Sequence, residues 1–104
     1  MLTGKQKSYL RGLANRLKPV MQIGKDGLNK DGIIEVLNYL HKHELMKINI
    51  LQNSDTTLEE LKAAFESIDV EVVQTIGRTI VLYQESDDET IEHIKLPIAK
   101  DKKN

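Results

Sequence analysis

The stretch Ile23-Gly24-Lys25-Asp26-Gly27-Leu28-Asn29 joins a short apolar segment to the start of a helix, with two glycines and a lysine at the junction. Glycine allows the backbone to fold tightly enough for its amides to approach a phosphate. The start of a helix adds a partial positive charge, and Lys25 adds a full one. Because these features favour an anion, we predict that the Gly-x-x-Gly loop, residues 24–27, contacts a nucleic-acid backbone.

The segment before this loop predicts one helix and one strand. Thr3, with Gln6 three residues later, has the form of a capping box that opens a helix. Apolar residues then recur at helical spacing up to the break expected at Pro19, namely Leu10, Leu13, Ala14 and Leu17. Residues 20–23 are apolar and are bounded by Pro19 and Gly24, which predicts a strand.

The segment after the loop begins with a second helix, which Asn29 caps and which runs to about His43. Its buried stripe is expected to contain Ile33, Val36, Leu37 and Leu40. Residues 45–51 then alternate, with Met46, Ile48 and Ile50 on one face and Lys47 and Asn49 on the other. One face of the sheet is therefore expected to be exposed to solvent.

The second half of the chain predicts one more helix and a hairpin. Thr57 and Glu60 repeat the capping-box pattern, and the apolar stripe that follows is Leu58, Leu61, Phe65 and Ile68. Residues 70–76 and 79–83 are strand-like and are joined by Gly77-Arg78, a pair that fits a type II′ turn. Such a turn is expected to project Arg78 into solvent.

The predicted order is helix, strand, helix, strand, helix, strand, strand, which is typical of an α/β fold with a mixed four-stranded sheet packed with helices. The 104 residues suffice for a single compact domain with one core. The acidic run Glu85-Ser86-Asp87-Asp88-Glu89 predicts a linker after this domain. We therefore expect a domain over residues 1–84, and over residues 85–104 an acidic linker and a partly disordered tail, in which apolar residues dock weakly: Ile91, Ile94, Leu96 and Ile98.

Charge divides unevenly along the chain. Residues 1–50 hold nine Lys or Arg against four Asp or Glu, whereas residues 51–104 hold six against twelve. The basic half carries the Gly-x-x-Gly loop, but Asp26 brings the side-chain charge of the loop to zero. Backbone amides and the helix start are therefore expected to make the loop contact, and other cations to supply the wider field that attracts RNA: Lys7, Arg11, Lys18, Lys30, Lys47 and Arg78.

Several classes of site and location are disfavoured by the sequence. The chain has no cysteine, no apolar run of the ~20 residues that span a bilayer, and no secretory signal at its start, so a cytoplasmic protein without disulfides is expected. His41 and His43 lie about 200° apart on a helix and are not expected to hold a metal. No catalytic motif is present, so we expect no enzyme activity, no cofactor and no small-molecule substrate.

The small number of aromatic residues predicts how RNA is recognised. Only Tyr9, Tyr39, Phe65 and Tyr83 are present, which is too few for a base-stacking platform. Phe65 lies on a core stripe, and Tyr83 is expected to pack in the core in preference to stacking on a base. Shape and backbone contacts are the expected mode of binding.

Five blocks, in this order, resemble the stand-alone bacterial CRM (chloroplast RNA splicing and ribosome maturation) domain of the YhbY-like proteins over nearly the whole chain. They are Lys5-Gln6-Lys7 with Leu10-Arg11-Gly12-Leu13-Ala14; Leu17-Lys18-Pro19; Ile23-Gly24-Lys25-Asp26-Gly27-Leu28; His43-Glu44-Leu45-Met46-Lys47-Ile48; and Val73-Gln74-Thr75-Ile76-Gly77-Arg78-Thr79-Ile80-Val81-Leu82-Tyr83. The family commonly has arginine after the last strand, where this chain has Gln84.

The resemblance implies a fold like the C-terminal domain of bacterial translation initiation factor three and a KH-like Gly-x-x-Gly loop that contacts RNA. It also implies association with precursors of the large ribosomal subunit. Our hypothesis is a monomeric, non-catalytic protein that binds pre-ribosomal RNA and assists assembly of the large (50S) subunit. The alternative is a protein–protein adaptor with oppositely charged faces, and an RNA-modifying enzyme is a distant third.

Overall fold

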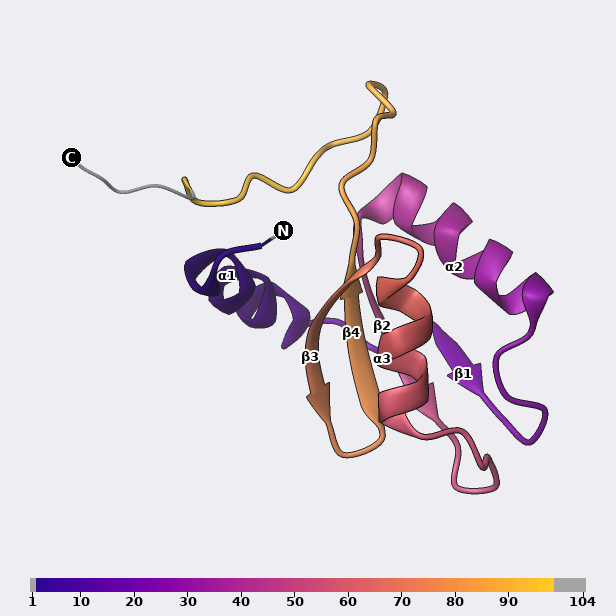
Figure 1. Ribbon diagram of the computed structural model, residues 1–104. Helices are drawn as coiled ribbons and strands as arrows, with labels where there is room; N and C mark the ends of the chain where they lie inside the picture. The colour runs from indigo at the N-terminus through magenta and orange to yellow at the C-terminus, as the bar shows by residue number, and fades with distance from the viewer. Residues whose placement is uncertain (1, 99–104) are drawn as a thin grey trace.

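The computed structural model describes residues 2–98, which form three helices and one four-stranded sheet (Figure 1). The elements are α1 (Gly4–Ala14), β1 (Met21–Ile23), α2 (Lys30–His43), β2 (Leu45–Ile50), α3 (Leu58–Glu66), β3 (Glu71–Ile76) and β4 (Thr79–Tyr83). The sheet order is β1-β2-β4-β3, with β1 parallel to β2 and the other two pairs antiparallel. The predicted α/β fold class, element order and mixed sheet are confirmed.

The predicted helix starts are confirmed in atomic detail. Thr3 and Thr57 both close capping boxes, in which the threonine hydroxyl accepts from the backbone N–H three residues on, at 3.1 Å in each case. Asn29 caps α2 through its side-chain oxygen, which accepts from the Gly32 N–H at 2.8 Å. These local hydrogen bonds satisfy amides that would otherwise lack a partner at the first turn.

Helices cover both faces of the sheet, α2 and α3 on one side and α1 on the other (Figure 1). The larger core lies under α2 and α3 and includes Val36, Leu40, Ile48, Leu61, Phe65, Ile80 and Leu82. The smaller core lies under α1 and contains Leu10, Ala14, Leu45, Val73, Val81 and Tyr83. Tyr83 is 5% exposed and packs in this smaller core, as expected.

The prediction that one face of the sheet is exposed is wrong where α1 covers that face. Lys47 and Asn49 do lie on the face opposite Met46 and Ile48, but they belong to only one of its strands. In β4, Ile80 to Tyr83 are all buried, because their side chains alternate between the two cores. A continuous apolar run of this kind is typical of a strand covered on both faces.

The first helix is shorter than its apolar pattern suggests. It ends at Ala14, and Leu17, which was placed on the buried stripe, lies beyond it and is 37% exposed. The chain must leave the helix there to reach the sheet, where the Val20 N–H donates to the Lys47 carbonyl at 3.0 Å. The pairing of Val20 with β2 therefore ends the helix several residues before Pro19, where the sequence alone predicted the break.

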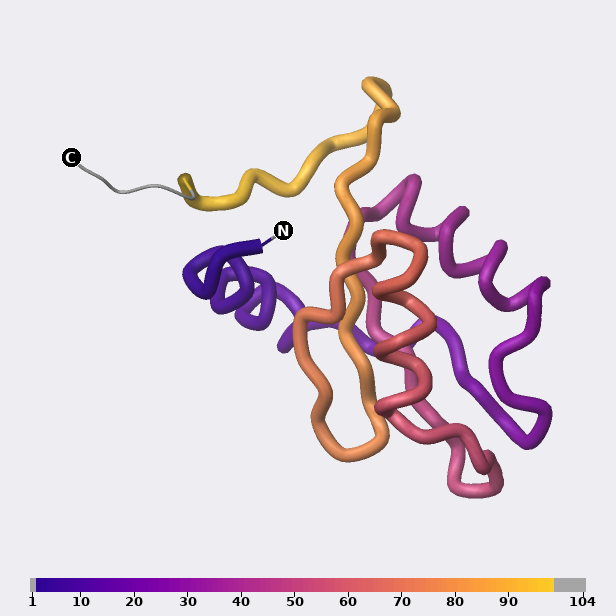
Figure 2. Tube along the Cα trace, viewed as in Figure 1, coloured from indigo at the N-terminus to yellow at the C-terminus, as the bar shows by residue number. Residues whose placement is uncertain are grey.

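The C-terminal segment, residues 85–98, leaves β4 and turns back across α1 (Figure 2). It is fastened by Glu44, the residue that ends α2 in a left-handed conformation with φ 67°. The Glu44 carboxylate is buried and accepts from the Ser86 N–H at 2.7 Å and the Ile94 N–H at 2.8 Å. Its Oε2 also lies 2.8 Å from Nδ1 of His93.

Apolar contacts hold the rest of this segment. Ile94 and Leu96 pack against the smaller core, and the Gln6 side-chain amide donates to the Pro97 carbonyl at 3.1 Å. Ile98 is 77% exposed and does not dock. The domain boundary expected after residue 84 stays a prediction, and the disordered tail expected at the chain end lies, over residues 99–104, outside the described residues.

We expect the contribution of His93 to stability to depend on pH. The hydrogen bond with Glu44 raises the pKa of His93 above 6.5. Burial alone would raise the pKa of Glu44, but hydrogen bonds from Ser86, His93 and Ile94 lower it below 4.5. The stability that His93 contributes to the fold is thus fully present below pH 6.5 and is lost as pH rises through the raised pKa of His93. The stability that Glu44 contributes is lost as pH falls through the lowered pKa of Glu44.

Thermal melts of the parent and of His93→Ala, from about pH 5 to about pH 9, measure this dependence. The melting temperature of the variant should lie furthest below that of the parent at the acidic end and approach it at the basic end. Glu92→Ala, a change at the exposed neighbouring residue, is the control. A His93→Ala deficit that is the same at every pH would contradict the ion pair.

Candidate nucleic-acid interface

Three connections meet at one end of the sheet (Figure 1). Because β1 and β2 are parallel, the loop after β1 (residues 24–29) and the loop after β2 (residues 51–57) leave the sheet at the same end of the strands. The turn that joins the antiparallel strands β3 and β4, Gly77-Arg78, lies at the same end of the sheet. The predicted Gly-x-x-Gly loop therefore lies in a cluster of loops, separated from α1 by the sheet.

The Gly-x-x-Gly loop is a four-residue turn closed by a hydrogen bond from the Gly27 N–H to the Gly24 carbonyl at 3.0 Å. Within residues 2–98, neither the Lys25 N–H nor the Asp26 N–H donates a hydrogen bond, and both residues are exposed. The turn thus presents two backbone donors and one ammonium group to solvent. Such an arrangement suits a phosphate oxygen, which accepts from backbone amides and attracts a cation.

Only the second glycine of the loop is required by the conformation. Gly27 has φ 70°, a region that side chains disfavour, and a Cβ there would lie 2.8 Å from the Thr56 hydroxyl. A Cβ on Gly24 would meet Leu51 at an ordinary 3.6 Å. Gly27 therefore lets the turn pack against the loop after β2, whereas the fold leaves room for a side chain at Gly24.

The charge around the loop is more acidic than its four residues suggest. A hollow of about 400 Å³ beside the loop is lined by Asp31 and Glu35 of α2 as well as by Lys25 and Asp26. Asp31 and Glu35 are four residues apart, so they lie on one face of the helix, a spacing that could have been noticed in the sequence. Because three carboxylates face one lysine, a phosphate is favoured at the exposed tip of the turn and disfavoured inside the hollow.

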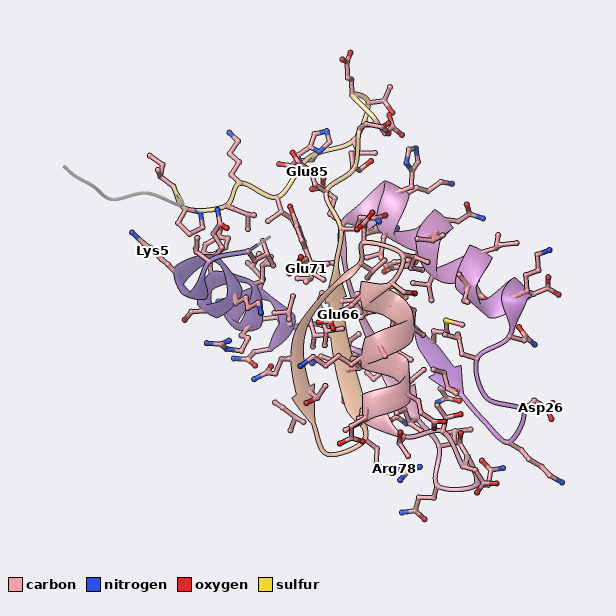
Figure 3. The ribbon with its side chains drawn as sticks, in the orientation of Figure 1. Lys5, Asp26, Glu66, Glu71, Arg78 and Glu85 are labelled. Atoms are coloured by element: carbon pink, nitrogen blue, oxygen red, sulfur yellow. The ribbon has the colours of Figure 1, made fainter. Side chains whose placement is uncertain are left out.

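Arg78 is exposed, as predicted, but its guanidinium is also held by backbone carbonyls. The turn is as expected, with Gly77 at φ 58°, but the guanidinium folds back across the strand ends. Its Nε donates to the Ile50 carbonyl at 2.9 Å and its Nη2 to the Leu51 carbonyl at 2.7 Å. Within residues 2–98 no carboxylate pairs with Arg78, so its charge remains at the loop-bearing end of the sheet (Figure 3).

The other predicted cations do not form one patch. Lys30 lies in the first turn of α2 beside the loop, and Lys47 lies on the α1 side of the sheet. Lys18 is exposed in the connection from α1 to β1. Arg11 and Lys7 lie on α1, away from the loop, and Lys7 shares a hollow with three acidic residues: Glu66, Asp69 and Glu71.

Acidic residues also gather on the flank of the molecule that faces α1. Figure 3 shows Glu66, Glu71 and Glu85 along the flank of the molecule that faces α1. Carboxylates this close to Lys7 reduce its attraction for a polyanion, an effect that no local sequence pattern signals. Lys7 is therefore less suited to contact a phosphate than its charge alone suggests.

The two histidines near the end of α2 contact different partners. His41 lies 3.8 Å from Asp87 and 3.7 Å from Asp88, and the His43 ring packs on Tyr39 with centroids 4.2 Å apart. Among residues 2–98 no group of three His, Asp or Glu is placed to hold a metal ion. Over the same residues, no helix has the length and apolar character needed to cross a membrane.

Comparison with known proteins gives a consistent result. The CRS1 / YhbY (CRM) domain family model matches residues 2–84. The Bacillus subtilis "Probable RNA-binding protein YqeI" is 42% identical over 98 residues, which are 93% of this chain and the whole of that protein. A Haemophilus influenzae protein named "RNA-binding protein" is 36% identical over 92 residues, 88% of this chain and 93% of its own length.

A solved structure supports the same assignment. The solution structure of SAV1595 from Staphylococcus aureus superimposes with a TM-score of 0.70 at 44% sequence identity. The match covers 90% of this chain and all of SAV1595. The sequence relationship and the shared architecture therefore agree.

Proposed function

Because this chain belongs to the CRS1 / YhbY (CRM) domain family, we propose that it is a non-catalytic RNA-binding protein of the cytoplasm. One observation of the structure carries the proposal: the exposed turn of residues 24–27 offers the Lys25 and Asp26 amides and the Lys25 ammonium at the start of a helix. The names of the Bacillus and Haemophilus relatives support RNA as the polyanion.

The mode of binding follows from the groups at this end of the molecule. Backbone amides and cations contact phosphates and carry no base preference of their own, so structured RNA is recognised by shape. Lys30 and Arg78 add charge beside the turn, while the acidic flank limits indiscriminate binding of RNA elsewhere. We place the RNA-binding unit in residues 1–84, the part that contains all these groups.

Affinity for structured ribosomal RNA is expected to fall steeply as salt rises. About four to six phosphate contacts give a slope of roughly −3 to −5 in a plot of log affinity against log salt concentration. Fluorescence anisotropy with a labelled ribosomal RNA fragment, over a salt series, measures this slope. A flat dependence, or no binding at low salt, would refute the proposed function.

We further propose that the RNA is that of large-subunit precursors and that the protein assists assembly of the 50S subunit. The resemblance to stand-alone bacterial members of the family supports this target. On gradients of cell extract at low salt, the protein should sediment with immature large subunits and move to the top fractions after ribonuclease treatment. Sedimentation in the top fractions both with and without ribonuclease would instead favour the adaptor.

A further inference from the structure

A second hollow, of about 250 Å³, lies on the α1 side of the sheet, where α1 has ended and the strands are uncovered. The strand register brings the lining residues of β2, β3 and β4 together. Ile76 pairs with Thr79 across the hairpin, and Val81 pairs with Gln74 on one side and with Lys47 on the other. Asn15, the cap residue of α1, borders the hollow from the helix. Since one water occupies ~30 Å³ of liquid, the space admits a ring-sized group.

The polar side chains around this hollow have no partner among the described residues. Within residues 2–98, the side chains of Asn15, Lys47, Gln74 and Thr79 make no hydrogen bond or ion pair. They offer an ammonium group, which donates, and two amides and a hydroxyl, each of which can both donate and accept. None of the described residues that line this hollow carries a carboxylate, in contrast to the hollow beside the Gly-x-x-Gly loop.

The apolar part of the lining suits a flat ring. Ile76 is 60% exposed, although it is a large aliphatic residue on a strand, and Val81 of the smaller core lines the same hollow. An apolar surface with donors and acceptors at its rim can receive the face of a nucleobase while hydrogen bonding its edge. The positive charge of Lys47 then complements the adjoining phosphate.

The hollow lies within reach of the loop cluster. Lys47 is three residues from Ile50 along β2, a distance of about 10 Å at the rise of a strand. The guanidinium of Arg78 lies at the end of β2, on the Ile50 and Leu51 carbonyls, and Thr79, which lines the hollow, follows Arg78 in the chain. A single RNA that contacts the turn at residues 24–27 can therefore extend past the end of β2 to the hollow.

We propose that this hollow binds an unpaired nucleotide of the RNA whose backbone contacts the Gly-x-x-Gly loop. The inference rests on the proposed function and specifies its substrate: a helix with adjoining unpaired residues, as in a hairpin or bulge. The phosphate contacts supply affinity for any RNA, and Gln74 and Thr79 add the preference for an unpaired base. Fully paired RNA cannot place a base in the hollow.

The test compares a fluorescent RNA hairpin that has an unpaired loop with a blunt duplex of the same stem. The parent should bind the hairpin more tightly than the duplex. Gln74→Ala combined with Thr79→Val should weaken hairpin binding about tenfold, because two hydrogen bonds are lost, and duplex binding less than about twofold. Thr75→Val, on the same strand but on the other face, pairs with Ile80 and serves as the matched control.

Each possible result supports or overturns the proposed nucleotide subsite. Equal affinity of the parent for the two RNAs, or an equal loss for both in the double variant, overturns the proposed subsite while RNA binding stands. Failure of the parent to bind either RNA refutes the proposed function itself. A double variant that alters the sedimentation of the free protein would instead indicate that a second copy occupies the hollow.

A measurement on the parent avoids dependence on the fold of the variant. In ¹H–¹⁵N spectra titrated with the unlabelled hairpin, the Gln74 side-chain amide and the Thr79 backbone amide should shift, and the Thr75 amide should not. Shifts confined to residues 24–27 and their neighbours would overturn the subsite.

Discussion

Replacing Glu44 with alanine is expected to lower the free energy of unfolding by about 2 to 4 kcal/mol. The buried carboxylate accepts from two backbone amides, those of Ser86 and Ile94, and pairs with His93. Alanine leaves these groups without an acceptor and so frees the segment that carries Ile94 and Leu96 onto the smaller core. Water can reach part of the segment, which keeps the expected loss below the full cost of three unpaired buried groups.

Urea denaturation measures this loss, and two variants separate its causes. Glu44→Gly also removes the carboxylate but suits the left-handed conformation at φ 67°, so it should be more stable than Glu44→Ala by up to about 1 kcal/mol. Glu89→Ala, at an exposed residue of the same segment, should change stability by less than about 0.5 kcal/mol. Equal stability of Glu44→Ala and Glu89→Ala would show that the segment contributes nothing to the fold.

Lys25→Asp is expected to weaken RNA binding by about 1 to 3 kcal/mol. The substitution removes the cation at the tip of the turn and places a fourth carboxylate beside Asp26, Asp31 and Glu35. Because Lys25 is exposed, the melting temperature should stay close to that of the parent. The salt dependence should also become shallower, since at least one phosphate contact is lost.

Anisotropy titrations with the same ribosomal RNA fragment measure this effect. Lys42→Asp is the matched control, because it makes the same charge change at an exposed position near the other end of α2. If both variants bind RNA equally well and melt like the parent, the Gly-x-x-Gly loop is a structural turn only. The interface would then have to be sought around Lys47 and Arg11.

Much of this fold could be predicted because its signals are local. A capping box needs only Thr3 and Gln6, and a type II′ turn needs only Gly77 and its neighbour. The Gly-x-x-Gly turn could be predicted from the sequence for the same reason, since its closing hydrogen bond joins residues that are three apart. The element order, and with it the fold class, follows from such short-range features and from apolar periodicity.

The tertiary structure decided which distant groups share a surface. The amino-acid sequence determined that residues 24–27 form a turn before a capped helix, because the glycines and Asn29 act on their own backbone. It did not determine that Glu35 faces the loop hollow, that Glu44 holds residues 86–94, or that Gln74 and Thr79 border the same hollow as Lys47. Those arrangements depend on strand register and on which face each helix covers, and both are set by packing between residues far apart in the chain.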